Sequence, residues 1–261
     1  ALIDAVESVR LETASAWLLG TVRNDALSDQ TRTGALAALA KLADDSLVQE
    51  AVQFALEKGS RRLQREALRW QAQSAGSLQA IKSALEGEDL KGQQVAIASL
   101  ARDTSQEAMD LMGDLMSQLA EGEISDALSL DVLELVESKG APEIQQMAVD
   151  YKTKLAEQSP FKEFAVTLNG GDVEAGRRIF LEREEVACLR CHKVEGAGGE
   201  VGPVLDGLAT RQSLDYIMES MLYPNSVIAE GYESVLIETK DDNYYAGLIK
   251  EENDEKIVLN S

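Results

Sequence analysis

The only two cysteines and the only histidine of the chain lie together in one motif, Cys188-Leu189-Arg190-Cys191-His192. Two thiols separated by two residues can reach the two vinyl groups on one edge of a porphyrin. A histidine that follows directly is then placed under the iron as its proximal ligand. The motif therefore predicts one covalent haem c, with Cys188 and Cys191 forming the thioethers and His192 binding iron.

Two other chemistries use a similar pair of cysteines, and we keep both as alternatives. A thioredoxin-like dithiol opens a helix that follows a strand, whereas residues 176–183 have a helical pattern. A structural zinc site needs four ligands, usually cysteine or histidine, and this sequence holds three such residues. The residue inventory favours haem over both.

The second axial ligand of such an iron is less well defined by the sequence. No other histidine exists, so a second imidazole from this chain is excluded. Met218 and Met221 are the only methionines after the motif, which makes them the candidates. Their helical spacing and apolar neighbours fit core packing equally well.

The elements around the motif can be predicted from capping and periodicity. Asp172 is placed to cap a helix that continues through Phe180, and a second helix is expected from about Ser213 to Leu222. A glycine-rich loop, 196–203, lies between them. Strands are expected at 232–240, 244–250 and 256–260. Apolar residues expected to line a haem pocket are Val186, Leu205, Leu208, Ile217, Leu222 and Ile228.

The first 165 residues are rich in alanine and leucine and have helical periodicity throughout. Short breaks recur with a period of roughly thirty residues, which favours stacked, HEAT-like helix pairs. We expect the turns inside the pairs at 44–45, 75–76, 103–104 and 140–141, and those between pairs at 59–60, 87–88 and 122–123. Met109, Met112 and Met116 are expected in the core. Ala1 has the pattern of a position inside a helix, which suggests preceding sequence.

The chain has a formal net charge of −21. Such a surface repels phosphate backbones and so disfavours nucleic acid as a partner. It attracts basic surfaces of partner proteins, with a strong dependence on salt. No run of eighteen or more uncharged apolar residues is present, so we expect no membrane span.

From about Leu168 onward the sequence resembles the haem-binding domain of planctomycete and verrucomicrobial type, a divergent cytochrome c module. The resemblance rests on Gly170-Gly171-Asp172, Gly176-Arg177-Arg178-Ile179-Phe180, Cys188-Leu189-Arg190-Cys191-His192-Lys193, Gly198-Gly199-Glu200-Val201-Gly202-Pro203, Glu219-Ser220, Pro224-Asn225, Ile228 and Gly231-Tyr232-Glu233.

This resemblance implies several properties beyond the motif. In cytochromes c the proline of such a Gly-Pro pair accepts the proximal histidine's Nδ1–H through its carbonyl, which gives Pro203 a role beside His192. Proteins of this kind carry HEAT-like helices and often a propeller similar to sugar dehydrogenases with a quinone cofactor. The resemblance therefore implies a fused or separate donor dehydrogenase and an acceptor protein. Haem attachment outside the cytoplasm implies the bacterial periplasm or cell surface.

One departure from simple cytochromes c concerns the distal methionine. Residues 231–236 lack the expected Met-Pro pair, and in the resembling family such a motif follows a strand-rich insertion. We therefore expect the natural distal ligand beyond Ser261. A far-red absorption band typical of methionine-ligated ferric cytochromes c would contradict this expectation.

These observations predict a mostly α-helical protein with two domains. Residues 1–165 would form a HEAT-like α-solenoid, and 166–261 a cytochrome c-like helical haem domain with a C-terminal β-meander insertion, strand-rich from about 232. The predicted function is electron transfer by one haem c, as a non-catalytic module of a larger dehydrogenase-like protein. The alternative is a haem-based ligand sensor or peroxidase-like site with an open sixth iron position.

Overall fold

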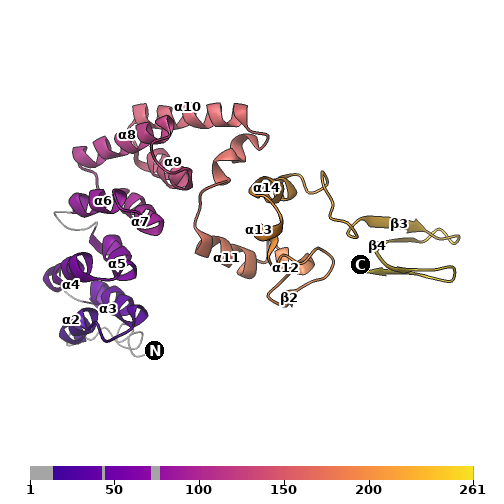
Figure 1. The fold of residues 1–261 in the computed structure, drawn as a ribbon, viewed down its shortest axis with the longest axis horizontal. Coiled ribbons are helices and arrows are strands. Elements are labelled where there is room, and N and C mark those ends of the chain that lie inside the picture. The colour runs from indigo at the N-terminus through magenta and orange to yellow at the C-terminus, as the bar shows by residue number, and fades with distance from the viewer. Residues whose placement is uncertain (1–13, 43–44, 72–76, 261) are drawn as a thin grey trace. The chain divides into compact units, whose positions relative to one another are not determined.

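The computed structural model describes residues 14–42, 45–71 and 77–260. These residues are mostly helical, with small antiparallel sheets confined to the C-terminal part of the chain, as the fold class predicted (Figure 1). The chain divides into two compact units, 1–154 and 155–261. This division lies within a long helix, somewhat before residue 165.

The N-terminal unit is built from helices alone in the part that the structure describes. They are α2 (Ser15–Arg23), α3 (Asp29–Leu42), α4 (Asp45–Lys58), α5 (Arg61–Gln71), α6 (Ser77–Leu85), α7 (Leu90–Leu100), α8 (Gln106–Glu121), the 3-10 turn η2 (Asp126–Leu128), α9 (Ser129–Lys139) and α10 (Pro142–Gln158). Helices α3, α5, α7 and α9 contact one another in succession. Each also packs against the helix that precedes it.

The pairing of these helices differs from the sequence prediction. The most extensive contacts between successive helices are α2 with α3, α4 with α5, α6 with α7, and α8 with α9. The turns at 59–60, 87–88 and 122–123 therefore lie inside pairs, and our assignment of them between pairs was wrong. Gly122 ends α8 with a left-handed φ of 75°, and the chain continues through η2 into α9, which packs against α8. The predictions at Ala1, Asp44 and 75–76 fall outside the described residues.

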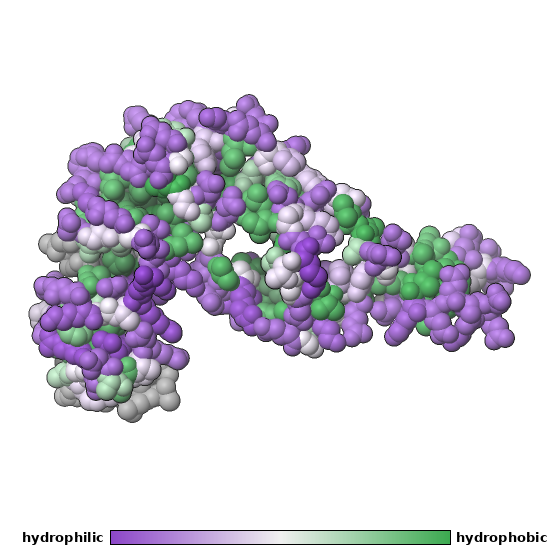
Figure 2. All heavy atoms as spheres, viewed as in Figure 1, coloured by the Kyte–Doolittle hydropathy of each residue, from purple (hydrophilic) through white to green (hydrophobic). Residues whose placement is uncertain are grey.

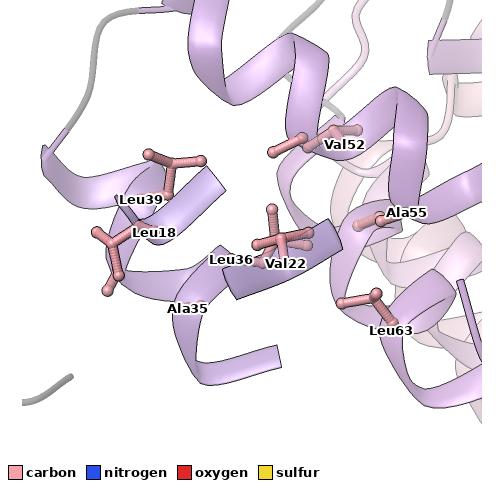
Figure 3. Close-up of a cluster of buried hydrophobic side chains, with 11 residues drawn as sticks. Leu18, Val22, Ala35, Leu36, Leu39, Val52, Ala55 and Leu63 are labelled. Atoms are coloured by element: carbon pink, nitrogen blue, oxygen red, sulfur yellow. The ribbon is translucent and has the colours of Figure 1, made fainter. Parts of the chain in front are cut away.

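The core of the N-terminal unit consists of close-packed aliphatic side chains. One cluster joins α2, α3, α4 and α5 through side chains that include Leu18, Leu36, Leu39 and Leu63, all with 0% exposure (Figure 3). Farther along, Met112 and Met116 are fully buried, which confirms these two as core residues. Met109 is only partly buried.

The C-terminal unit begins with the last residues of α10, which ends at Gln158. Its elements are η3 (Lys162–Thr167), α11 (Val173–Glu182), α12 (Cys188–Cys191), β1 (Lys193–Val194), β2 (Ala197–Gly198), α13 (Leu208–Arg211), α14 (Leu214–Leu222), β3 (Ser234–Glu238), β4 (Tyr244–Glu252) and β5 (Ile257–Asn260). The side chains of Asp172 and Ser213 cap α11 and α14, each by accepting a backbone N–H at the helix start. Both predicted helices are thus confirmed.

The last three strands form an antiparallel meander in the order β3-β4-β5. Val235 lies opposite Gly247, Ile237 opposite Tyr245, and Ile249 opposite Leu259, so these residues share one face. Leu248 is the only buried hydrophobic residue among the described strand residues. Hydrophobic residues, drawn in green, reach the surface over this sheet in Figure 2. Among the described residues, no helix is long and apolar enough to cross a membrane.

Candidate functional site

The two cysteines of the Cys-x-x-Cys-His motif begin and end a single helical turn, α12, in the C-terminal unit, and His192 follows it directly. Ala187 precedes it with a left-handed φ of 53°, an uncommon conformation for alanine that turns the chain sharply into the helix. His192 ends the helix in extended conformation, and its N–H donates to Cys188 O at 3.0 Å. The helical turn thus begins at one cysteine and ends at the other, and the chain becomes extended at His192.

The two cysteines are free thiols. Cys188 is half-buried and Cys191 is exposed. The regular element before them is the helix α11, as predicted, and not a strand. Among the described residues, no group of three or more His, Cys, Asp and Glu side chains is arranged to hold a metal ion. A zinc site with four protein ligands and a thioredoxin-like strand-to-helix setting therefore receive no support from this geometry.

The imidazole of His192 is oriented by one short hydrogen bond. Its Nδ1 lies 2.8 Å from the carbonyl oxygen of Pro203, the contact that the resemblance to cytochromes c implied. A carbonyl oxygen can only accept, so Nδ1 must carry the proton. In the neutral ring, Nε2 then has a free lone pair and is the nitrogen able to bind a metal.

The loop from 193 to 205 folds back tightly over the motif. Backbone N–H groups of Gly199 and Gly202 donate to Leu189 O at 2.9 Å and Cys191 O at 2.7 Å. A Cβ at Gly199 would lie 2.0 Å from Arg190 O. Only glycine allows this approach, because any side chain would overlap the backbone of α12.

Gly202 packs directly against the imidazole. A Cβ there would lie 2.8 Å from His192 Cε1 and 2.9 Å from Nδ1. Gly202 and Pro203 therefore act on the ring from neighbouring positions: one limits where the ring can lie, and the other accepts its proton. The sequence identified Pro203 through the resemblance, but nothing local in it indicated the contact with Gly202.

A small hairpin that the sequence prediction missed supports this loop. Strand β1 pairs with β2, and the turn residues Glu195 and Gly196 both have positive φ, 50° and 83°. Two successive positive φ values characterise the type I′ turn that matches the twist of a hairpin. A Glu-Gly pair is a weaker signal for this turn than Asn-Gly or Asp-Gly, which explains the omission.

Ion pairs join the β1–β2 hairpin to α11 and to the glycine-rich loop. Arg177 on α11 pairs with Glu195 at 3.2 Å, and Lys193 pairs with Glu200 at 3.0 Å. The hydrogen bond and positive charge of Lys193 lower the pKa of the Glu200 carboxyl below its ordinary value. These exposed pairs are weak individually, but they join α11, β1 and the glycine-rich loop.

Large apolar side chains around the motif are left in contact with solvent. Exposed examples from α11 to the loop are Ile179, Val186, Val201 and Val204, with relative exposures between 37% and 48%. Of the predicted pocket residues, Val186 and Ile228 are exposed, while Leu205, Leu208, Ile217 and Leu222 are partly buried. Exposed apolar side chains of this kind are ones that a large hydrophobic group would cover.

The two methionine candidates differ in their environments. Both lie on α14, where Met218 is 8% exposed and Met221 is 66% exposed. Met218 is the only buried hydrophobic residue between 162 and 247 among the described residues. Its burial agrees with the packing role considered from the sequence, and the assignment of either sulfur to iron stays a prediction.

Comparison with known proteins adds no relative to this description. No protein-family model, no curated protein and no solved structure matches the chain.

Proposed function

We propose that the C-terminal unit is a cytochrome c-like domain that binds one haem c and transfers electrons. Cys188 and Cys191 would form the thioethers, and His192 would bind the iron. The observation that carries the proposal is the hydrogen bond between His192 Nδ1 and Pro203 O. It leaves the Nε2 lone pair as the one able to bind a metal, in the residue that directly follows the second of two free thiols with the spacing of haem attachment.

The chemistry of the surrounding residues fits this group. A porphyrin presents a broad apolar surface, and the exposed apolar side chains of Val186, Val201 and Val204 occur close to the motif in the chain. Covering them would be favourable by roughly 25 cal/mol for each Å² of apolar area removed from water. The donor set, one imidazole and two thiols, suits haem c better than a four-ligand zinc site.

The bound haem would supply one-electron exchange between ferric and ferrous iron. The chain's own residues would fix its position through two thioethers, orient the proximal imidazole through Pro203, and exclude water through apolar side chains. The net charge of −21 would draw basic surfaces of redox partners toward the protein. We expect a donor dehydrogenase, fused or separate and similar to quinone-cofactor sugar dehydrogenases, and an acceptor protein, in the periplasm or at the cell surface.

For the N-terminal unit we propose a HEAT-like solenoid that presents a surface to partners. The support is the contact pattern, in which α3, α5, α7 and α9 follow one another and each packs on its preceding helix. Stacked helix pairs give this nearest-neighbour pattern. The proposed haem-binding residues Cys188, Cys191 and His192 all lie in the other unit.

The test is expression of the full chain together with a haem c maturation system. We expect one haem per chain that remains attached after denaturation and acidic organic extraction. The Cys188→Ala/Cys191→Ala variant should lose this covalent haem. His192→Ala should retain the thioethers but change the axial ligation, visible in the absorption spectrum.

Three outcomes would overturn the proposal. The first is a chain that never acquires covalent haem, and the second is stoichiometric zinc bound at the cysteines. The third is reversible dithiol chemistry as the only redox activity of the matured protein. Tight carbon monoxide binding without displacement of a native ligand would favour the sensor function instead.

A further inference from the structure

The backbone that carries the Pro203 carbonyl is itself held by contacts from two directions. On one side, Leu205 N–H donates to Lys193 O at 3.0 Å. Asp206 adds a second link, because its Oδ1 accepts the N–H of Glu195 at 2.9 Å. Residues 205 and 206 are thereby attached to the β1–β2 hairpin directly after His192.

Arg211, which follows this segment in the sequence, also binds it. Its guanidinium donates to the carbonyl of Asp206 at 2.5 Å and to that of Val204 at 3.3 Å. The planar fork of arginine suits two acceptors of fixed separation. Arg211 is also the last residue of α13, so this short helix is tied back to the segment that follows Pro203.

We propose that Asp206 and Arg211 are positioning residues that act on His192 through the carbonyl of Pro203. The peptide unit of this carbonyl includes the nitrogen of Val204, so fixing residues 204–206 fixes the direction of the acceptor. Hydrogen bonds weaken steeply as their angle departs from linear. Contacts that hold this carbonyl therefore set the strength of the Nδ1–H bond and the tautomer of the ring.

The two contacts can be tested in the haem-free chain, because its single histidine gives unambiguous signals. The measurement is the ¹⁵N NMR spectrum of His192 at one fixed pH at which the ring is neutral. Asp206→Asn removes the charge but keeps an acceptor oxygen, whereas Asp206→Ala removes both. We expect the Nδ1–H tautomer in the parent and in D206N, and a substantial Nε2–H population in D206A.

The haem-bearing protein offers a second test, which rests on the proposed function. A strong Nδ1–H bond makes the imidazole a better electron donor and favours ferric iron, so its loss raises the reduction potential. Removal of a nearby positive charge favours ferric iron and lowers the potential. Arg211→Gln both weakens the Nδ1–H bond and removes a positive charge. The proposal requires that the increase in reduction potential from the first effect exceeds the decrease from the second.

Arg178→Gln is the matched control for charge. Arg178 is exposed, and no hydrogen bond or ion pair of its side chain occurs within the described part of the chain. We expect R211Q to raise the ferrous-to-ferric ratio at fixed solution potential about tenfold, equivalent to 59 mV for one electron. R178Q should leave this ratio unchanged or lower it.

The outcomes separate this inference from the proposed function. Equal shifts of the same sign in R211Q and R178Q, or an unchanged tautomer in D206A, would overturn the positioning role. Failure of the parent chain to bind haem would overturn the proposed function, while the tautomer experiment would still decide the role of Asp206.

Discussion

The two units of this chain reach their folded states by different means. In 14–154, buried aliphatic residues such as Leu18, Leu36 and Leu63 form a close-packed core. In 155–260, only three hydrophobic side chains among the described residues are buried, namely Phe161, Met218 and Leu248. Backbone hydrogen bonds and glycine contacts organise the motif instead. The contrast indicates that the first unit is stabilised by its own aliphatic core, whereas the second buries few hydrophobic side chains of its own; under the proposed function, haem would add the missing apolar contacts.

The largest expected effect is the response of the two units to haem attachment. Covalent haem should stabilise 155–260 by on the order of 4 kcal/mol, comparable to a ligand at about 1,000 times its Kd. Residues 14–154 should change little. Hydrogen exchange of the full chain with and without haem measures both units at once. Equal stabilisation of both units by haem, or no stabilisation of 155–260, would contradict the proposed difference between them.

A second experiment compares a buried leucine with an exposed one. Leu36 is 0% exposed in the N-terminal core, whereas Leu236 on β3 is 70% exposed. Leu36→Ala should reduce the free energy of unfolding by about 2–5 kcal/mol, because it removes packing and leaves a cavity. Leu236→Ala should change it by less than about 0.5 kcal/mol. Denaturant unfolding of the haem-free chain measures both, and similar losses would refute the contrast.

Local sequence signals predicted the elements that frame the site. Asp172 and Ser213 cap α11 and α14 through hydrogen bonds to residues three positions away, so the caps are visible in sequence. The three C-terminal strands were found from alternation and turn residues. In both cases the decisive interactions lie within a few residues of each other.

The contacts that orient His192 could not be found in this way. Asp206 meets Glu195, and Arg211 reaches the carbonyl of Val204, and neither contact leaves a periodic or capping pattern. The packing of Gly202 on the imidazole likewise depends on how the loop closes. The prediction of which N-terminal helices form pairs was wrong for a related reason, because a repeat period does not reveal whether a helix packs against the helix before it or the helix after it.

A third comparison tests two glycines of the C-terminal unit. Gly202 has no space for a side chain because His192 lies against it, while a Cβ at Gly176 on α11 meets nothing within 4 Å. Gly202→Ala should displace the imidazole and weaken iron ligation by about tenfold. Gly176→Ala should stabilise α11 by about 0.5–1 kcal/mol. The rate of axial ligand exchange in the haem protein measures the effect of G202A, and thermal unfolding measures that of G176A.

The smallest expected effect concerns the pH dependence of the loop over the motif. Lys193 lowers the pKa of Glu200 below 4.5 in the folded protein, so this pair stabilises the loop above pH 4.5. Its contribution is lost as the pH falls through the lowered folded pKa. Titration of the Glu200 carboxyl by ¹³C NMR should show the lowered pKa, and Lys193→Met should return it toward 4.5. Because both side chains meet water, added salt should shrink the difference. If the pKa of Glu200 stays low in K193M, another donor must stabilise its carboxylate, and the loop over the motif would be held by more than its exposed ion pairs.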